Sequence, residues 1–302
     1  MKKFAKGWMV MKKKKMFLFL FFIFIFTCRS TPGLAKETIL FGLCPKYNAR
    51  IMYQLYQPFV DYLSENTPYQ FEIKLSRFYQ ETIDRLGKGE TVIASCGPIP
   101  YIKARDKFKV KPILRALSKD GKAYYRGIII VREDSPIQNL SDLKGKTLAF
   151  AQEWSTAGYI LPRYYLMKSG ISLKDLKGYA FLRHHDFVAD AVLKREFDAG
   201  AVKDIVAYKY QEKGVRFIFM TDPIPTVAIV TKTDAPKEMV NSVKTALLKL
   251  NPGDSAHQKR MSQWDEEFKY GFTEASDSDY DPIRKILRMV EKESHVRGPI
   301  LE

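Results

Sequence analysis

Short apolar runs alternate with amphipathic stretches along this chain from residue 38 onwards. Thr38–Leu43 and Thr91–Cys96 are continuous apolar runs, and Phe71–Leu75 alternates apolar and polar residues. Arg50–Leu63 and Glu81–Leu86 carry apolar side chains at helical spacing. Alternating and continuous runs predict strands, whereas a period of about 3.6 residues predicts helices. The strand-helix order therefore predicts βα units that build a mostly parallel sheet with helices on both faces.

The pattern restarts at Gly127 and predicts a second α/β lobe. Further strands are predicted at Gly127–Val131, Thr147–Ala151, Gly178–Phe181, Phe197–Val202, Phe217–Met220 and Val227–Val230. Further helices are predicted at Pro162–Lys168, Phe187–Lys194, Met239–Leu250 and Asp281–Glu293. We expect residues 36–130 to form lobe 1, residues 131–225 to form lobe 2, and residues 226–302 to complete lobe 1.

The first 35 residues have the pattern of an export signal. Lys12–Lys15 precede Met16–Phe26, an apolar run that is short for a membrane span but typical of a signal-peptide core. Small residues in Gly33–Ala35 predict cleavage after residue 35. Lipidation of Cys28, in a lipobox-like context, and an uncleaved signal anchor are the alternatives. All three predict an exported protein, either periplasmic or membrane-anchored and facing the outside.

Composition and charge narrow the class further. The chain has 302 residues, 46% of them hydrophobic and 28% charged, which is typical of a folded globular protein. Half of the formal charge of +16 comes from the eight Lys and Arg of residues 1–35. The basic clusters Lys103–Lys107 and Lys109–Lys111 lack interleaved aromatics, so we predict no nucleic-acid partner. No zinc-type spacing of Cys or His occurs, and we predict no metal, no cofactor and no catalytic residue.

The segment Ser155-Thr156-Ala157-Gly158 follows a predicted strand and begins a helix. Two hydroxyls and several backbone N–H groups then meet at the positive end of a helix dipole, which suits an anion. The alternative is an ordinary helix cap with nothing bound.

A second candidate is His184-His185-Asp186, which offers two donors and an acceptor between an apolar run and a helix. A carboxylate repels a bound oxyanion unless that anion has a proton to donate. Asp186 would therefore select hydrogen phosphate, phosphite or phosphonate over fully ionised sulfate. The alternative is that Asp186 caps the helix and the histidines are solvated.

Two cysteines and several tyrosines lie at predicted strand ends and loops. Cys44 and Cys96 would be close enough for a disulfide if their strands are neighbours, and two unrelated buried thiols are the alternative. The turn at Gly97 suits a close approach of backbone to a ligand. Aromatic walls of a pocket could come from tyrosines on or near loops, namely Tyr47, Tyr79, Tyr101, Tyr124 and Tyr125.

In order, these pieces resemble the phosphate/phosphite/phosphonate-binding proteins of ABC importers, over residues 37–250 and a late motif. The segments that carry the resemblance are FGLCPKYNARIMYQLYQPFVDYL, ASCGPIPYIKA, IIIVREDSPIQNLSDLKGKTLAFA, EWSTAGYILPRYYL, HHDFVADAVLKREFDAGAV and GFTEASDSDYDPIRKI. The resemblance implies a type II periplasmic-binding-protein fold with the ligand held between two closing lobes. The implied partners are a phosphorus oxyanion and a permease in the inner membrane, and we expect a monomer.

The resemblance also implies ligand contacts. In lobe 2 they are Ser155, Thr156, Ala157, His185 and Asp186, and in lobe 1 Tyr79, Cys96, Gly97 and Tyr101, with Tyr47 nearby. One departure concerns the tail of the ligand: where aminoalkyl-phosphonate binders supply an acid after Asp198–Val202, this chain has Lys203 and later Tyr208.

Two other functions remain open at this point. One is a ligand sensor that signals to a membrane partner. The other is a transferase with Cys44 or Cys96 as the nucleophile and His185 as the base, which would need an activated thiolate.

Overall fold

Lobe 1 is built on a six-stranded sheet in the order β13-β4-β12-β3-β1-β2. The computed structural model describes residues 36–296. The strands of this sheet are β1 (Thr38–Leu43), β2 (Gln70–Leu75), β3 (Ile93–Cys96), β4 (Lys111–Ala116), β12 (Ala228–Thr231) and β13 (Phe272–Glu274). Strands β2, β1, β3 and β4 run in the same direction, whereas β12 and β13 run in the opposite direction.

Lobe 2 repeats this arrangement in a five-stranded sheet with the order β10-β6-β9-β7-β8. Its strands are β6 (Gly127–Arg132), β7 (Thr147–Phe150), β8 (Gly178–Phe181), β9 (Ala199–Lys203) and β10 (Val215–Met220). Strand β6 alone is antiparallel to the other described strands of this sheet. The lobe boundary expected from the sequence, between residues 130 and 131, falls inside β6.

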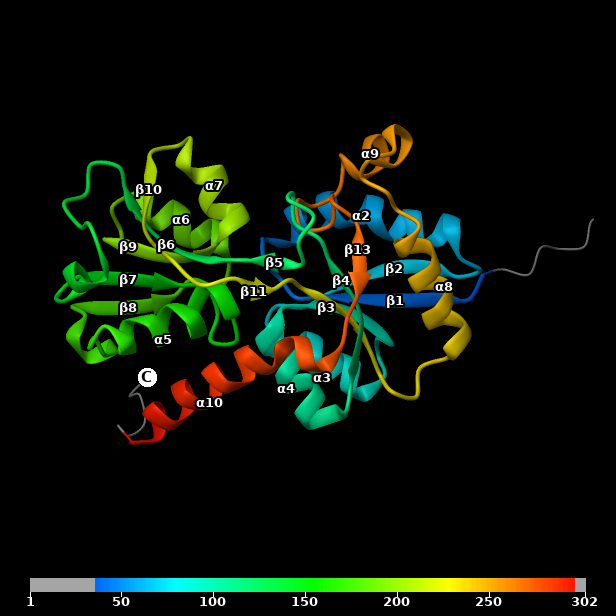
Figure 1. Cartoon of the computed structure of the whole chain (residues 1–302), viewed down its shortest axis with the longest axis horizontal. Coiled ribbons are helices and arrows are strands. Elements are labelled where there is room, and N and C mark those ends of the chain that lie inside the picture. Colours follow the sequence, from blue (N-terminus) through cyan, green and yellow to red (C-terminus); the bar gives the residue numbers. More distant parts are fainter. Residues whose placement is uncertain (1–35, 297–302) are drawn as a thin grey trace, which may run out of the picture. The chain divides into compact units, whose positions relative to one another are not determined.

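Two crossing segments join the lobes. Strand β5 (Tyr124–Tyr125) leads into β6, and β11 (Ile224–Pro225) leads back into β12. Strands β5 and β11 pair with each other in a short antiparallel ribbon. Figure 1 shows this ribbon between the two sheets. In both lobes the strand that follows the crossing segment, β6 or β12, is antiparallel to its two neighbours in the sheet.

Helices cover both faces of each sheet, as the alternating pattern predicts. They are α2 (Ala49–Asn66), α3 (Tyr79–Lys88), α4 (Pro98–Phe108), α8 (Lys237–Leu248) and α9 (Ser255–Met261) in lobe 1, and α5 (Leu161–Lys168), α6 (His185–Leu193) and α7 (Asp204–Gln211) in lobe 2. Short helical turns are η1 (Leu140–Leu143), η2 (Thr156–Ile160), η3 (Leu173–Asp175) and η4 (Asp277–Tyr280). Helix α10 (Asp281–Val296) contacts both α4 and α5, so it touches both lobes.

The C-terminal segment packs on lobe 1 through its aromatic residues. Trp264 meets Phe59 of α2 edge-to-face at a centroid distance of 5.3 Å, and Phe268 lies 4.6 Å from the same ring. Both residues are almost completely buried. Aromatic pairs of this kind add to the stability gained from burial. They fix the position of the loop between these two aromatics, which reaches the site described below.

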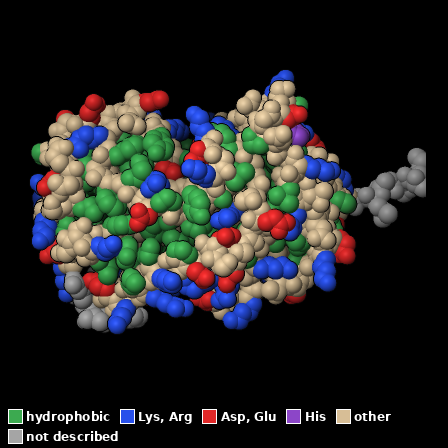
Figure 2. Space-filling model, in the orientation of Figure 1, with side chains coloured by type: hydrophobic (Ala, Val, Ile, Leu, Met, Phe, Trp, Pro, Cys, Tyr) green, Lys and Arg blue, Asp and Glu red, His purple; other side chains and the backbone are tan. Residues whose placement is uncertain are grey.

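Most of the predicted strands and helices are present within a few residues of their expected bounds, and β1 and β8 match them fully. The strands β4, β5, β11 and β13 and the helices α7 and α9 were not predicted. No helix among residues 36–296 is both long and apolar enough to cross a membrane. The predicted export signal, with Cys28 and Ala35, lies outside the described residues. On the face shown in Figure 2, Lys and Arg are scattered and hydrophobic side chains gather over lobe 2.

Candidate functional site

Six loops, three from each lobe, begin at the carboxyl ends of equivalent strands. In lobe 1 the loops after β1, β2 and β3 carry Lys46, the start of α3 at Tyr79, and the Cys96-Gly97 turn. In lobe 2 the regions after β7, β8 and β9 carry Ser155, the start of α6 at His185, and Lys203. Open α/β sheets bind ligands outside the carboxyl ends of their strands.

These loops enclose a cavity of about 50 Å³. Its lining also includes Tyr125 of the crossing ribbon and Glu267 of the C-terminal segment. The full lining is Leu43, Cys44, Lys46, Tyr56, Tyr79, Ser95, Cys96, Gly97, Pro100, Tyr125, Ser155, Thr156, Ala157, His185, Lys203, Val227 and Glu267. The structure thus brings together seven of the ten predicted ligand residues, namely Ser155, Thr156, Ala157, His185, Tyr79, Cys96 and Gly97.

Ser155 and Thr156 form the start of the helical segment that runs through η2 into α5. Ser155 is its N-cap, and its Oγ accepts a hydrogen bond from the Gly158 N–H at 3.0 Å. Thr156 Oγ1 accepts from the N–H of Ile99, in lobe 1, at 3.0 Å. Each hydroxyl also has one proton to donate, and Ser155 and Thr156 lie within hydrogen-bond reach of the Tyr79 and Tyr125 side chains respectively. The segment predicted to form an anion cradle therefore lies at the cavity, and its role in binding an anion stays a prediction.

His185 faces this cradle as a neutral ring with a defined tautomer. Its Nδ1 accepts the backbone N–H of Lys203 at 3.1 Å, so the proton lies on Nε2, which is 3.4 Å from Ser155 Oγ. Burial, with the neighbouring charges of Lys203 and Lys46, lowers the pKa of His185 to about 3. The ring is therefore a hydrogen-bond donor towards Ser155 at the lining of the cavity, and a very weak base.

Two lysines and two carboxylates at the cavity form a buried network that sequence reasoning missed. Lys46 Nζ lies 2.5 Å from Asp265 Oδ1 and 3.4 Å from Glu267 Oε2, and Lys203 Nζ pairs with Glu267 Oε1. Burial lowers the pKa of Lys46, but the charges of Asp265 and Glu267 outweigh this effect and hold it well above its usual value. Burial raises the pKa of Glu267, but the two lysines outweigh it and lower the pKa to about 2. Lys46 and Glu267 are therefore both charged at neutral pH.

The sequence carried a partial signal for this network. Lys46 and Lys203 each stand at the carboxyl end of a strand, where the fold places ligand contacts. Nothing near Asp265 or Glu267 marks them, because they reach Lys46 from 219 and 221 residues away along the chain.

Tyr79 and Tyr125 add two phenol groups to the lining. Burial raises the pKa of each hydroxyl, so both remain protonated donors. Tyr125 also lies under Lys203, whose Nζ is 4.2 Å from the ring centroid. Of the loop tyrosines identified from the sequence, these two line the cavity.

Three predicted ligand residues do not line the cavity. Tyr101 is buried and donates its hydroxyl proton to Asp277 Oδ1 at 2.6 Å, in the direction of Tyr280 and the C-terminal helix. Tyr47 is buried with Lys46 Nζ 4.9 Å from its ring centroid. Asp186 is buried in the first turn of α6, where burial raises its pKa, and its Oδ1 has no hydrogen-bond partner.

Cys44 and Cys96 are neighbours at the carboxyl edge of the lobe 1 sheet, and both are free thiols here. The Cys44 N–H donates to the Ser95 carbonyl at 3.2 Å, which continues the pairing of β1 with β3. A hydrogen bond with Cys44, together with burial, raises the pKa of the Cys96 thiol. A thiol that stays protonated is a poor nucleophile, which disfavours transfer by Cys96. The disulfide stays a prediction.

The lobes meet around the cavity through hydrogen bonds that backbone N–H groups donate. The Tyr79 N–H donates to Gln152 Oε1 at 3.1 Å, and the His185 N–H donates to the Lys46 carbonyl at 3.2 Å. Together with the bond from Ile99 to Thr156, these contacts close lobe 1 on lobe 2. The lining residues that take part in these contacts, Lys46, Tyr79, Thr156 and His185, are all buried.

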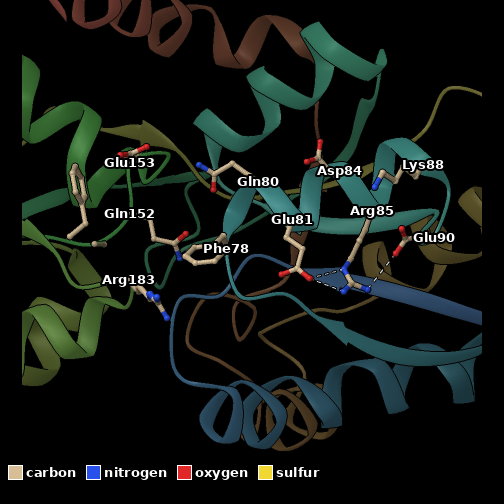
Figure 3. A pocket seen from close by; sticks show the side chains of 12 residues that line it. Phe78, Gln80, Glu81, Asp84, Arg85, Lys88, Glu90, Gln152, Glu153 and Arg183 are labelled. Atoms are coloured by element: carbon tan, nitrogen blue, oxygen red, sulfur yellow. Dashed lines mark hydrogen bonds and ion pairs between the residues drawn. The ribbon is translucent and has the colours of Figure 1, made fainter. Parts of the chain in front are cut away.

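A larger hollow of about 720 Å³ lies outside this cavity, beside α3. Figure 3 shows Arg85 paired with Glu81 and with Glu90 on the α3 side of this hollow. At its other end the Arg183 guanidinium lies 5.0 Å from the Phe78 ring and joins the two lobes. The hollow contains none of the predicted ligand residues. Within residues 36–296 no cluster of three or more His, Cys, Asp or Glu side chains could hold a metal ion.

Two lobes with equivalent strand order, two crossing segments and an enclosed, donor-rich cavity define a solute-binding protein of the periplasmic type. Residues 41–280, more than half of the chain, match the family described as the phosphonate, periplasmic substrate-binding protein of ABC transporters. The chain belongs to this family, which confirms the family and function class predicted from the sequence. The members of this family bind substrates for a transporter and are not enzymes, and membership implies an exported protein with an ABC transporter as its partner.

Individual relatives agree with this assignment. The chain is 23% identical over 279 residues to the phosphate-import protein PhnD of Mycolicibacterium smegmatis, covering 85% of this chain and 87% of the relative. A binding-protein component of an ABC phosphonate transporter from Pseudomonas aeruginosa superposes with a TM-score of 0.79 at 20% identity, over 88% of this chain and 91% of the other. PhnD1 of Prochlorococcus marinus, solved with methylphosphonate, gives 0.76 at 19% identity, over 85% and 99%. These structural matches confirm the predicted two-lobed fold.

Proposed function

We propose that this protein captures a phosphorus oxyanion, either phosphate, phosphite or a small phosphonate, in the cavity between its lobes and delivers it to an ABC permease. The observation that carries the proposal is the donor set of the lining. Ser155, Thr156, Tyr79, Tyr125 and His185 Nε2–H supply neutral donors. Hydrogen bonds to a charged acceptor are stronger than neutral ones, which favours an anion in this place.

The charges around the cavity support the same ligand class. Lys46 and Lys203 bring two ammonium groups to the lining, and the start of the helical segment at Thr156 adds the positive end of a dipole. Their carboxylate partners keep the unliganded site from being strongly positive. An anion in the cavity would meet donors that are already held in place. Its binding would therefore cost little reorganisation of the protein.

A thermal-denaturation panel tests the ligand class. The protein is purified after export and processing, freed of bound ligand, and melted with phosphate, phosphite, methylphosphonate, aminoethylphosphonate or sulfate. A ligand at 100 times its dissociation constant stabilises the folded state by about 2.7 kcal/mol. We expect a rise in Tm with at least one phosphorus oxyanion and none with sulfate. No rise with any phosphorus oxyanion at millimolar concentration contradicts the proposal.

The predicted role of Asp186 is tested in the same assay. If this carboxylate selects an anion that still carries a proton, Asp186→Asn removes the preference for hydrogen phosphate over sulfate. An unchanged preference in a folded variant excludes Asp186 from the recognition of the ligand.

We propose further that the chain is processed after Ala35 and works as a monomer that binds no nucleic acid. The mass of the exported protein distinguishes cleavage after Ala35 from lipidation at Cys28 and from an uncleaved leader. Sedimentation gives the oligomeric state. Uptake of the ligand in cells that lack the protein separates transport from a sensing role, because a sensor changes signalling and leaves uptake intact.

A further inference from the structure

The two buried lysines form one wall of the ligand cavity. Lys46 comes from the loop after β1 in lobe 1, and Lys203 is the last residue of β9 in lobe 2. They are only 5% and 6% exposed, so their stems fill space that would otherwise belong to the cavity. Both ammonium groups turn to the same carboxylate, Glu267.

The Glu267 carboxylate already has three partners in this structure. Glu267 pairs with both lysines and accepts the Tyr56 hydroxyl at 3.0 Å. Asp265, 1% exposed, holds Lys46 from the other side and accepts from the Glu267 N–H at 3.0 Å. A cationic group on a ligand would have to take Glu267 away from two buried lysines and leave them unpaired, which is strongly unfavourable.

The volume of the cavity sets a second limit. A site needs roughly 10–15 Å³ on this measure to hold one water-sized group. The cavity of about 50 Å³ therefore accommodates a phosphorus centre with its oxygens and one small substituent. A two-carbon tail with an amine does not fit beside the lysine stems.

We propose that Lys46 and Lys203, held by Glu267 and Asp265, are specificity-determining residues that close one end of the cavity. They restrict the ligand to a phosphorus oxyanion whose remaining substituent is no larger than a methyl group. The lysines exclude longer tails by occupying their space, and they exclude amine-bearing tails by charge as well. This inference rests on the proposed function and narrows its substrate class.

Calorimetric titration of the wild-type protein with four phosphonates tests it. Methylphosphonate has the small substituent, ethylphosphonate a longer neutral tail, 2-aminoethylphosphonate a cationic tail and phosphonoacetate an anionic tail. We expect each of the three longer ligands to bind at least a hundredfold more weakly than methylphosphonate. Binding of any of them within tenfold of methylphosphonate overturns the inference.

Paired variants show whether the lysine wall is the cause. Lys203→Ala with Glu267→Gln removes one ammonium and its partner together, so no buried charge is orphaned, and it opens space. We expect ethylphosphonate and aminoethylphosphonate to bind this variant within tenfold of methylphosphonate. Lys203→Met with Glu267→Gln keeps the volume and is expected to keep excluding ethylphosphonate. If the open variant also excludes every tail, the lysine wall is not the determinant.

Two controls keep the outcomes distinct. Lys107→Ala with Asp84→Asn removes an exposed lysine-carboxylate pair outside the lining and should leave all four affinities unchanged. If wild type binds none of phosphate, phosphite and methylphosphonate, the proposed function itself fails. If it binds these and the longer ligands equally well, only the size limit fails.

Discussion

The two lobes share a strand order and supply different chemistry to the same cavity. The order β2-β1-β3-β12-β4 in lobe 1 corresponds to β8-β7-β9-β6-β10 in lobe 2, with the incoming antiparallel strand in the same place. One helical segment follows β1 in lobe 1 and another follows β7 in lobe 2. Each begins with an N-cap side chain that accepts a hydrogen bond from the backbone N–H three residues further on. In lobe 1 the cap is Asn48, outside the lining, and in lobe 2 it is Ser155, inside it.

The comparison shows that the shared fold places equivalent strand ends and helix starts at the cavity in both lobes. The side chains at these positions determine which chemical groups each lobe supplies. Lobe 2 contributes Ser155, Thr156 and His185, which line the cavity and are the donors to the ligand in the proposed function. Lobe 1 contributes Lys46 and, through its C-terminal segment, the carboxylates that neutralise and orient both lysines. Since Glu267 pairs with a lysine from each lobe, the network also links the lobes in the closed arrangement.

The largest expected effect of a single substitution is in the charge network of lobe 1. Asp265→Asn leaves Lys46 buried with one anion fewer, and breaking a buried ion pair costs about 3–5 kcal/mol. Chemical denaturation should show a loss of this size in the free energy of unfolding. Glu65→Gln, which breaks an exposed pair with Arg260, should cost less than about 1 kcal/mol. Equal losses in the two variants would mean that burial of the network contributes nothing.

The two N-caps provide a matched pair for binding. Ser155→Ala removes a donor to the ligand, and we expect affinity for the oxyanion to fall roughly ten- to a hundredfold. Asn48→Ala removes the equivalent cap in lobe 1 and should destabilise α2 by about 1 kcal/mol without changing affinity. Titration calorimetry measures both variants. A similar loss of affinity in the two would contradict the assignment of the cradle to lobe 2.

Gly158 and Ile51 are equivalent, because each donates its N–H to the N-cap three residues before it. Lobe 2 has glycine at this position because other atoms lie too close for a side chain. A Cβ at Gly158 would lie 2.6 Å from Ala151 Cβ, 2.8 Å from His185 Cε1 and 2.8 Å from Ser155 Oγ. Gly158→Ala should cost about 2 kcal/mol of stability and weaken binding, because Ser155 and His185 must shift. Gly178→Ala, with no atom within 4 Å, is the control and should leave ligand affinity unchanged. Unchanged affinity in Gly158→Ala as well would contradict the close packing of the cradle.

The neutral state of His185 predicts a pH dependence of stability. Its pKa is about 3 in the folded protein and 6.5 in the unfolded chain, so the unfolded state binds more protons between these values. Stability from this group is present above pH 6.5 and is lost as pH falls towards 3, at up to about 1.4 kcal/mol per pH unit. In His185→Gln this slope should be smaller between pH 6.5 and 4.5, above the range in which Glu267 titrates. Identical slopes would show that His185 is not buried as a neutral ring.

The predicted bridge between Cys44 and Cys96 concerns lobe 1 alone and has the smallest expected effect on binding. An exported protein folds where disulfides persist, so denatured protein should titrate no thiols before reduction and two after it. The count assumes that Cys28 leaves with the leader. Two thiols without reductant would show that the cysteines remain free, as they are in the structure.

Periodicity predicted most of the fold because nearly every strand and helix buries one side against a partner. It missed β4 because Lys111 and Arg115 interrupt the apolar pattern, and it missed the ribbon of β5 and β11 because each strand has only two residues. For the site, local patterns identified Ser155, Thr156 and His185. They did not identify Asp265 and Glu267, because aromatic packing on Phe59 brings these carboxylates to the cavity from a distant part of the chain. Asp186 and Tyr101 have the right chemistry and sequence position, but their side chains do not line the cavity.

The most direct test is a crystal structure of the protein with methylphosphonate. The account predicts the phosphonate in the cavity between the lobes, with its oxygens about 3 Å from Ser155 Oγ, Thr156 Oγ1 and the Tyr79 hydroxyl and its methyl group against the lysine wall. A methylphosphonate bound elsewhere, or one whose oxygens avoid these three atoms, would contradict it.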